Sequence, residues 1–133
     1  MQNESLLHHE LTEQILSAFY QVYNSLGTGF LEKVYENALL LELERRGLAV
    51  KQQTPIKVFY AGKVVGEYFA DLVVENKVLL ELKAGETIHQ AHVSQLNNYL
   101  RATRIEVGLI LNFGTKPEFK RRVFTNERKP LPA

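Results

Sequence analysis

The chain has 133 residues and no cysteine, which excludes disulfide bonds and metal sites built from thiolates. Because disulfides are rare in reducing compartments, we expect a cytoplasmic protein. The chain also lacks an apolar run approaching the roughly 18 residues that a membrane-spanning helix needs. Its first residues lack the basic stretch and apolar core of a secretory signal. We therefore expect neither secretion nor contact with a membrane.

Acidic and basic side chains are unevenly distributed, although the net charge is only +1. Residues 1–50 carry seven acids and three bases, whereas residues 101–133 carry eight bases and three acids. The composition is otherwise that of one globular domain, with 45% apolar residues. A basic C-terminal segment would help an acidic site to hold a polyanion such as nucleic acid; the alternative is a solvated tail. The candidate contacts are Lys116, Lys120, Arg121 and Arg122.

Apolar residues recur at three- and four-residue spacing in three segments, which predicts three amphipathic helices. These segments are residues 10–26, 30–46 and 87–102. Gly27-Thr28-Gly29 separates the first two, because glycine favours the end of a helix.

Apolar runs predict strands at residues 48–53, 56–60, 64–74, 78–83 and 107–111. Thr54-Pro55 separates the first two runs, and the last is continuously apolar, as in a strand covered on both faces. A strand, a helix and an apolar strand in succession imply a parallel pair joined by a right-handed crossover. The order predicts an α/β sandwich, with a mixed sheet between helices. A polar tail from residue 115 is expected to fray at its end.

Asp71 is the only aspartate beside fourteen glutamates, and it lies in an apolar, strand-like run. A carboxylate there is costly unless it is paired, neutralised or bound to a cation. Glu81 and Lys83 follow in the next predicted strand, where alternation points both side chains to one face. Two carboxylates on one face would attract Mg²⁺ or Mn²⁺, and the carbonyl of Leu82 could supply a further oxygen. The alternative for Glu81 and Lys83 is an ordinary ion pair.

The loop between these two strands decides whether the carboxylates meet. A two-residue loop at Asn76-Lys77 would pair Asp71 with Leu82 and turn its carboxylate away from Glu81. A three-residue loop or a bulge would set Asp71 opposite Glu81. The metal hypothesis therefore requires the odd loop or a bulge. Glu75-Asn76-Lys77 permits either, because asparagine tolerates left-handed backbone angles.

Two helical segments carry polar residues that could reach the same place. His92, Gln95, Leu96 and Tyr99 share one face of the third predicted helix. If that face packs on the sheet, Gln95 and Tyr99 lie near the carboxylates; the alternative is that Tyr99 is core and Gln95 only donates hydrogen bonds. In the second predicted helix, Glu32 and Tyr35 share a side that could reach the sheet edge. The alternative for Glu32 is a partner of the helix dipole.

Four motifs follow one another between residues 10 and 124. Gly29, Glu32 and Tyr35 form G-x-x-E-x-x-Y, and Asp71 precedes Glu81-Leu82-Lys83. Gln95 and Tyr99 form Q-x-x-x-Y, and residues 109–114 end an apolar strand. In this order the motifs resemble those of the GxxExxY proteins, a branch of the PD-(D/E)xK nuclease superfamily. Ala70 stands where the superfamily's name has proline, a position that varies among its members.

The resemblance implies a restriction-endonuclease-like core and metal-dependent hydrolysis of nucleic acid, DNA more than RNA. It implies that Asp71 and Glu81 bind the metal and that Lys83 is the catalytic lysine. Glu32 would be an auxiliary acid and a candidate further ligand, and the supporting residues would be Tyr35, His92, Gln95 and Tyr99. Cleavage of two strands by so small a domain would need a partner subunit, hence a homodimer. The alternatives are a non-catalytic nucleic-acid-binding or adaptor module and a purely structural ion-pair network.

Overall fold

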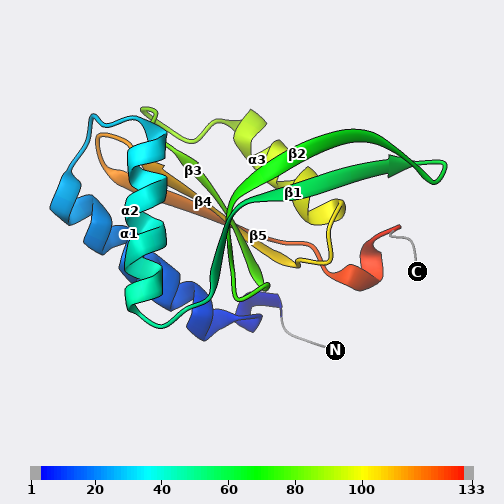
Figure 1. Ribbon diagram of the computed structural model, residues 1–133, viewed down its shortest axis with the longest axis horizontal. Helices are drawn as coiled ribbons and strands as arrows, with labels where there is room; N and C mark the ends of the chain where they lie inside the picture. Colours follow the sequence, from blue (N-terminus) through cyan, green and yellow to red (C-terminus); the bar gives the residue numbers. More distant parts are fainter. Residues whose placement is uncertain (1–3, 131–133) are drawn as a thin grey trace.

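A five-stranded mixed sheet with strand order β1-β2-β3-β4-β5 forms the centre of the protein, and helices cover both faces (Figure 1). The computed structural model describes residues 4–130. Its strands are β1 Val50–Tyr60, β2 Lys63–Val74, β3 Val78–Lys83, β4 Val107–Phe113 and β5 Pro117–Val123. Its helices are α1 His9–Leu26, α2 Glu32–Arg45 and α3 Gln90–Arg101, with 3-10 turns at Glu4–Leu6 and Asn126–Arg128. This architecture confirms the predicted α/β fold.

The three predicted helices are present, with ends that differ from the prediction by at most three residues. The first two are separated where expected, since Gly27 and Gly29 have φ angles of 71° and 106° that favour glycine. Within residues 4–130, no helix combines the length and the apolarity needed to cross a membrane.

The parallel pair is β3 and β4, joined through α3, and all seven residues of β4 are buried. Both features confirm the prediction from the apolar run. Helix α3 packs closely over β4 at Gly108, where an added Cβ would lie 2.6 Å from Cδ1 of Leu96. A glycine at this position therefore fixes how near α3 comes to the sheet. The other neighbouring strands are antiparallel.

Each face of the sheet has its own hydrophobic core. The core on the α1/α2 side is the larger, and its rings are tightly packed: Phe113 stacks on Tyr35 at 4.3 Å and meets Phe19 edge-on at 4.8 Å between centroids. The core on the α3 side contains Ile56, Ala70, Val73, Leu79, Val93, Leu96, Tyr99, Leu100 and Ile110. The sheet therefore separates two packed layers, as expected for an α/β sandwich.

The prediction of two short strands before residue 60 is wrong, because β1 runs through Thr54-Pro55 without a break. Pro55 is paired with Phe69 of β2. Strand β1 lies at the edge of the sheet, where a residue without an N–H is tolerated. The long β1–β2 hairpin projects beyond the other strands, alongside α3 (Figure 1).

The segment from residue 115 was predicted as a polar tail, and this prediction missed a strand; the fraying predicted at its end concerns residues outside those that the structure describes. Residues Pro117–Val123 form β5 and pair along all of β4. Arg121 on this strand donates from Nη2 to the carbonyl oxygen of Leu7 at 2.7 Å, and Val123 packs against the α1/α2-side core. The sequence pattern did not predict β5, because only one face of this strand is apolar and that face contains an arginine.

Candidate metal centre

The loop between β2 and β3 has three residues, Glu75, Asn76 and Lys77, and Val74 pairs with Val78 across it. Glu75 and Asn76 both have φ angles of 54°, in the left-handed region. The predicted odd loop is therefore confirmed. Continuing the register, which runs from Val74 to Leu72 on β2, sets Asp71 opposite Glu81.

Asp71 ends the β2–β3 ladder by using its side chain in place of its backbone. The pairing stops at Leu72 and Leu80, and Oδ2 of Asp71 then accepts a hydrogen bond from the backbone N–H of Leu82 at 2.8 Å. In a strand the N–H and C=O of one residue point to the same neighbour, so the Leu82 carbonyl also faces the Asp71 side. The predicted oxygen donors thus lie on one side of β3.

The alternation of side chains along β2 is interrupted at Asp71. Ala70 belongs to the α3-side core and Leu72 to the α1/α2-side core, although the two residues are an even step apart. Across from Asp71, Gln53 of β1 has a left-handed φ of 52° and places Nε2 3.5 Å from Oδ1 of Asp71. The local distortion of the hairpin therefore coincides with the acidic residue.

Glu81 is almost fully buried on the α3 side of β3, and its Oε1 atom has no hydrogen-bond partner. Burial, followed by the negative charge of Asp71, raises the pKa of Glu81 to about 8, while Lys83 opposes the shift. Burial likewise raises the pKa of Asp71, against the hydrogen bond from Leu82. An unsatisfied buried carboxylate beside a second one is the arrangement that a bound cation would stabilise.

The donor set fits a hard divalent cation. Among residues 4–130, no group of three or more His, Asp and Glu side chains is clustered as a metal site. Two carboxylates and one carbonyl nevertheless suit Mg²⁺ or Mn²⁺, because such ions are commonly held by one or two carboxylates and retain several waters. Asp71, Glu81 and the carbonyl of Leu82 are the residues that would hold the ion.

Lys83 lies beside both carboxylates without forming a fixed ion pair. Its charge acts on the pKa values of Asp71, Glu81 and His92. Within residues 4–130, no salt bridge joins Lys83 to either carboxylate, so the ordinary ion pair is not what the structure contains. The loop after Lys83 is braced by the buried side chain of Asn112, which accepts from the N–H of Gly85 at 3.1 Å and donates to its carbonyl at 3.0 Å.

The acid of α2 whose charge raises the pKa of Asp71 is Glu36, one turn after Glu32. Glu36 is buried, and its carboxylate accepts hydrogen bonds from Nε2 of Gln52 at 2.6 Å and of Gln53 at 3.1 Å. Glu32 is exposed in the first turn of α2, where its charge acts on His92. Sequence reasoning missed Glu36 and Gln53, and the available signal was the four-residue step from Glu32 along the helix.

Two of the predicted supporting residues have structural contacts of their own. The hydroxyl of Tyr35 donates to the carbonyl of Gly27 at 2.7 Å and accepts from the N–H of Phe30, which ties the α1–α2 loop to the core. Nδ1 of His92 accepts from the N–H of His89 at 3.3 Å at the start of α3. The hydrogen bonds of the Tyr35 hydroxyl therefore go to the α1–α2 loop. The pKa of His92, in contrast, is lowered by burial and by the charge of Lys83.

The polar stripe of α3 faces the sheet. Tyr99 is buried, and burial followed by the charge of Glu81 raises its pKa to about 12, with Gln95 hydrogen-bonded to its hydroxyl. Tyr99 also packs against Tyr68 of the hairpin, with 5.5 Å between ring centroids. Gln95 and Tyr99 are thus near the carboxylates, while Leu96 belongs to the core.

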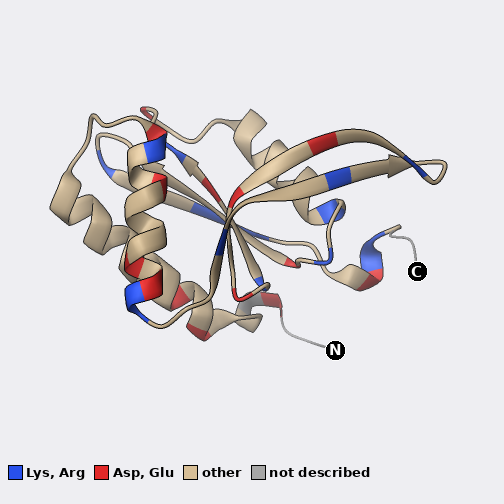
Figure 2. Ribbon diagram, in the orientation of Figure 1, with Lys and Arg blue, Asp and Glu red and all other residues tan. Residues whose placement is uncertain are grey.

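The predicted basic contacts lie on or next to β5, which β4 separates from β3, the strand of Glu81. Lys120, Arg121 and Arg122 lie on β5, which β3 and β4 separate from β2, and Lys116 immediately precedes β5. Figure 2 shows that acidic residues occur on α1 and α2 and also on the central strands and the hairpin. Lys116 and Lys120 are exposed, but Arg121 and Arg122 donate to backbone carbonyls. Along the register, Lys120 pairs with Ile110 and Ile110 pairs with Glu81, so Lys120 lies two strands from Glu81. Contact of the four residues with nucleic acid stays a prediction.

Comparison with known proteins bears on the family and the fold. A family model described as the PD-(D/E)XK nuclease superfamily matches residues 9–122. The crystal structure of SSO0001 has a similar fold, with a TM-score of 0.54 and 18% sequence identity over 97% of this chain. The chain spans only 63% of the length of SSO0001, and at this identity the likeness concerns the fold alone. A search of curated proteins finds no significant match.

Proposed function

This chain belongs to the PD-(D/E)XK nuclease superfamily, and from that premise we propose that it is a metal-dependent nuclease. The substrate is nucleic acid, DNA more than RNA, and the cofactor is Mg²⁺ or Mn²⁺. Within the superfamily we assign the chain to the GxxExxY proteins, on Gly29, Glu32 and Tyr35. We place it in the cytoplasm because it has no cysteine.

One observation carries the proposal: a three-residue loop and an interrupted strand set Asp71 opposite Glu81, whose Oε1 is buried without a partner. A purely structural network would pair its charges, yet in the described residues Lys83 is bound to neither acid by a salt bridge. Two raised carboxyl pKa values beside a loosely held lysine are typical of a functional site.

Each residue has a defined task in phosphodiester hydrolysis. A divalent cation held by Asp71, Glu81 and the Leu82 carbonyl would supply Lewis-acid activation of the phosphate and of water. The N–H of Leu82 orients Asp71. Lys83 stabilises negative charge on the phosphate or helps to deprotonate the attacking water. The water oxygen bonds to phosphorus, the bond from phosphorus to one sugar oxygen breaks, and the departing oxygen receives the proton that balances the one released.

The remaining site residues support the substrate and the acids. Gln95 and Tyr99 present polar groups toward the carboxylates, and His92 lies beside Lys83. Glu36 and Gln53 position Asp71, a task that we assign to Glu36 rather than to Glu32. If the enzyme cuts both strands of a duplex, it acts as a homodimer, since one centre cleaves one strand at a time.

The test is a cleavage assay on single- and double-stranded DNA and RNA with Mg²⁺, Mn²⁺ or EDTA. We expect metal-dependent products from the wild-type chain and none from Asp71→Asn, which keeps an oxygen to accept from Leu82. Asp71→Asn that cuts at the wild-type rate would overturn the proposal. Nucleic-acid binding indifferent to Mg²⁺, with no product over hours, would instead identify an adaptor module.

A further inference from the structure

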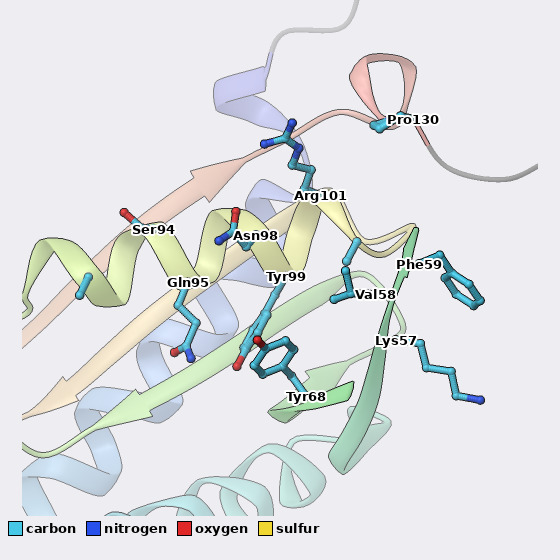
Figure 3. Close-up of a pocket in the computed structure, with 12 residues that line it drawn as sticks. Lys57, Val58, Phe59, Tyr68, Ser94, Gln95, Asn98, Tyr99, Arg101 and Pro130 are labelled. Atoms are coloured by element: carbon cyan, nitrogen blue, oxygen red, sulfur yellow. The ribbon is translucent and has the colours of Figure 1, made fainter. Parts of the chain in front are cut away.

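A cleft of about 680 Å³ lies between the β1–β2 hairpin and α3 (Figure 3). Val58 and Tyr68 line it from the hairpin, and Gln95, Asn98 and Tyr99 line it from the helix. Tyr99 in its wall belongs to the α3-side core, on the face of the sheet where Glu81 is buried. The volume of the cleft is in the range of sites that hold a small organic group, such as one nucleotide.

The wall of the cleft contains a pair of aromatic rings. Tyr68 and Tyr99 lie 5.5 Å apart between centroids, with Gln95 directed toward them (Figure 3). Tyr99 is 6% exposed and therefore fixed, whereas Tyr68 is 48% exposed and presents its ring to solvent. A half-exposed ring held by a buried neighbour can stack on a planar ligand with little loss of conformational freedom. Gln95 adds a hydrogen-bonding group for the edge of such a ligand.

The charged residues that line the cleft are basic. Lys57 and Arg101 are among its lining residues, and none of the described lining residues is acidic. Figure 3 shows the charged ends of both side chains directed away from the tyrosine pair, at the outer margin. A ligand that matches this arrangement is planar inside the cleft and anionic outside it, which is the chemistry of a nucleotide within a strand.

We propose that the cleft binds an unpaired base of the substrate, which makes single-stranded nucleic acid the preferred substrate class. This inference rests on the proposed nuclease function. In a duplex each base is stacked on its neighbours and paired along its edge, so a tyrosine ring can stack only on a base that is unpaired and free to leave its neighbours. Stacking tolerates any sequence, because every base has a π face. A single strand also needs only one catalytic centre.

Binding of fluorescein-labelled oligonucleotides to the full chain in EDTA, followed by fluorescence anisotropy, tests the proposal without cleavage. We expect single-stranded DNA or RNA to bind at least about tenfold more tightly than duplex of the same sequence. Tyr68→Ala should weaken binding of the single strand at least about fivefold, the lower limit for loss of one stacked base. Tyr68→Trp should retain binding.

The matched control is Tyr60→Ala, which removes a tyrosine of the same hairpin that is 76% exposed and does not line the cleft. We expect its affinity to be unchanged, and circular dichroism of each variant verifies the fold. Equal affinity for duplex and single strand, or unchanged binding by Tyr68→Ala, overturns the inference while leaving nuclease activity possible. Tyr68-dependent binding of single strands without any metal-dependent cleavage supports the cleft and overturns the nuclease instead.

Discussion

The two faces of the sheet differ in how their buried polar groups are satisfied: Glu36 of α2 is buried but accepts hydrogen bonds from Gln52 and Gln53. On the α1/α2 side, Phe19, Tyr35 and Phe113 join a continuous apolar core, and the one hydroxyl among them is hydrogen-bonded. On the α3 side, a smaller apolar core shares its space with Glu81, whose Oε1 has no partner. The first face is organised for stability and the second tolerates an electrostatic cost. Proteins commonly accept such a cost where chemistry occurs.

The difference predicts that changes on the α1/α2 side reduce stability most. Phe113→Ala removes a fully buried ring that contacts both Phe19 and Tyr35, so the free energy of unfolding should fall by about 3–5 kcal/mol. Urea denaturation measures this loss. Phe119→Ala is the control, because Phe119 is 40% exposed on β5, and it should cost less than about 1 kcal/mol. Equal losses in both variants would contradict the comparison.

Changes on the α3 side should reduce activity without reducing stability. Glu81→Gln removes a metal ligand but keeps the shape of the side chain, so cleavage should fall at least about a hundredfold. Because the lost carboxylate is buried beside Asp71, the free energy of unfolding in EDTA should stay level or rise at neutral pH. A loss of stability comparable to that of Phe113→Ala would show that Glu81 is a structural residue.

The raised pKa of Glu81 also predicts how stability depends on pH. The folded carboxyl keeps its proton up to a pKa of about 8, whereas the unfolded one loses it near its ordinary pKa of 4.5. Between these two pKa values the folded state therefore binds more protons than the unfolded state. The contribution of Glu81 to stability is complete below the lower pKa and disappears as pH rises through the higher pKa. Urea denaturation in EDTA across the window should show falling stability, with a smaller slope for Glu81→Gln.

The smallest expected effect separates Glu36 from Glu32. Glu36→Gln removes a charge that acts on Asp71 and loosens Gln53, so the Mg²⁺ concentration for half-maximal cleavage should rise about tenfold. Glu32→Gln is the matched control on the same helix, and its exposed side chain should shift the requirement less. A Mg²⁺ titration of cleavage measures both. A larger shift for Glu32→Gln would assign the auxiliary role to Glu32, as the family resemblance implies.

The sequence predicted those features that depend on local periodicity. The bounds of β3 and the parallel pair with β4 followed from apolar spacing and turn residues. Two strands required tertiary information: Pro55 fits β1 only because β1 is an edge, and β5 exists because buried β4 offers its second side for pairing. Neither position in the sheet is visible from composition.

The site was predictable where residues are close in sequence and not where they come from distant elements. Asp71 and Glu81 lie on one hairpin, so strand arithmetic reduced the question to the length of one loop, and the structure supplied that length. Glu36 acts on Asp71 through a contact of α2 with β1, and that contact depends on the left-handed backbone of Gln53. The cleft depends on the distance between a long hairpin and α3, which Gly108 and the strand lengths determine together.

The number of residues in the loop between β2 and β3 decides whether the two carboxylates lie on the same face. Removing one residue of this loop would shift the register by one and turn one carboxylate toward the opposite face, with every motif residue still present. Alignments that allow a gap at this loop would score such a sequence as intact. Among relatives of this chain, the number of residues between the aspartate and the glutamate is therefore as informative about activity as the residues themselves.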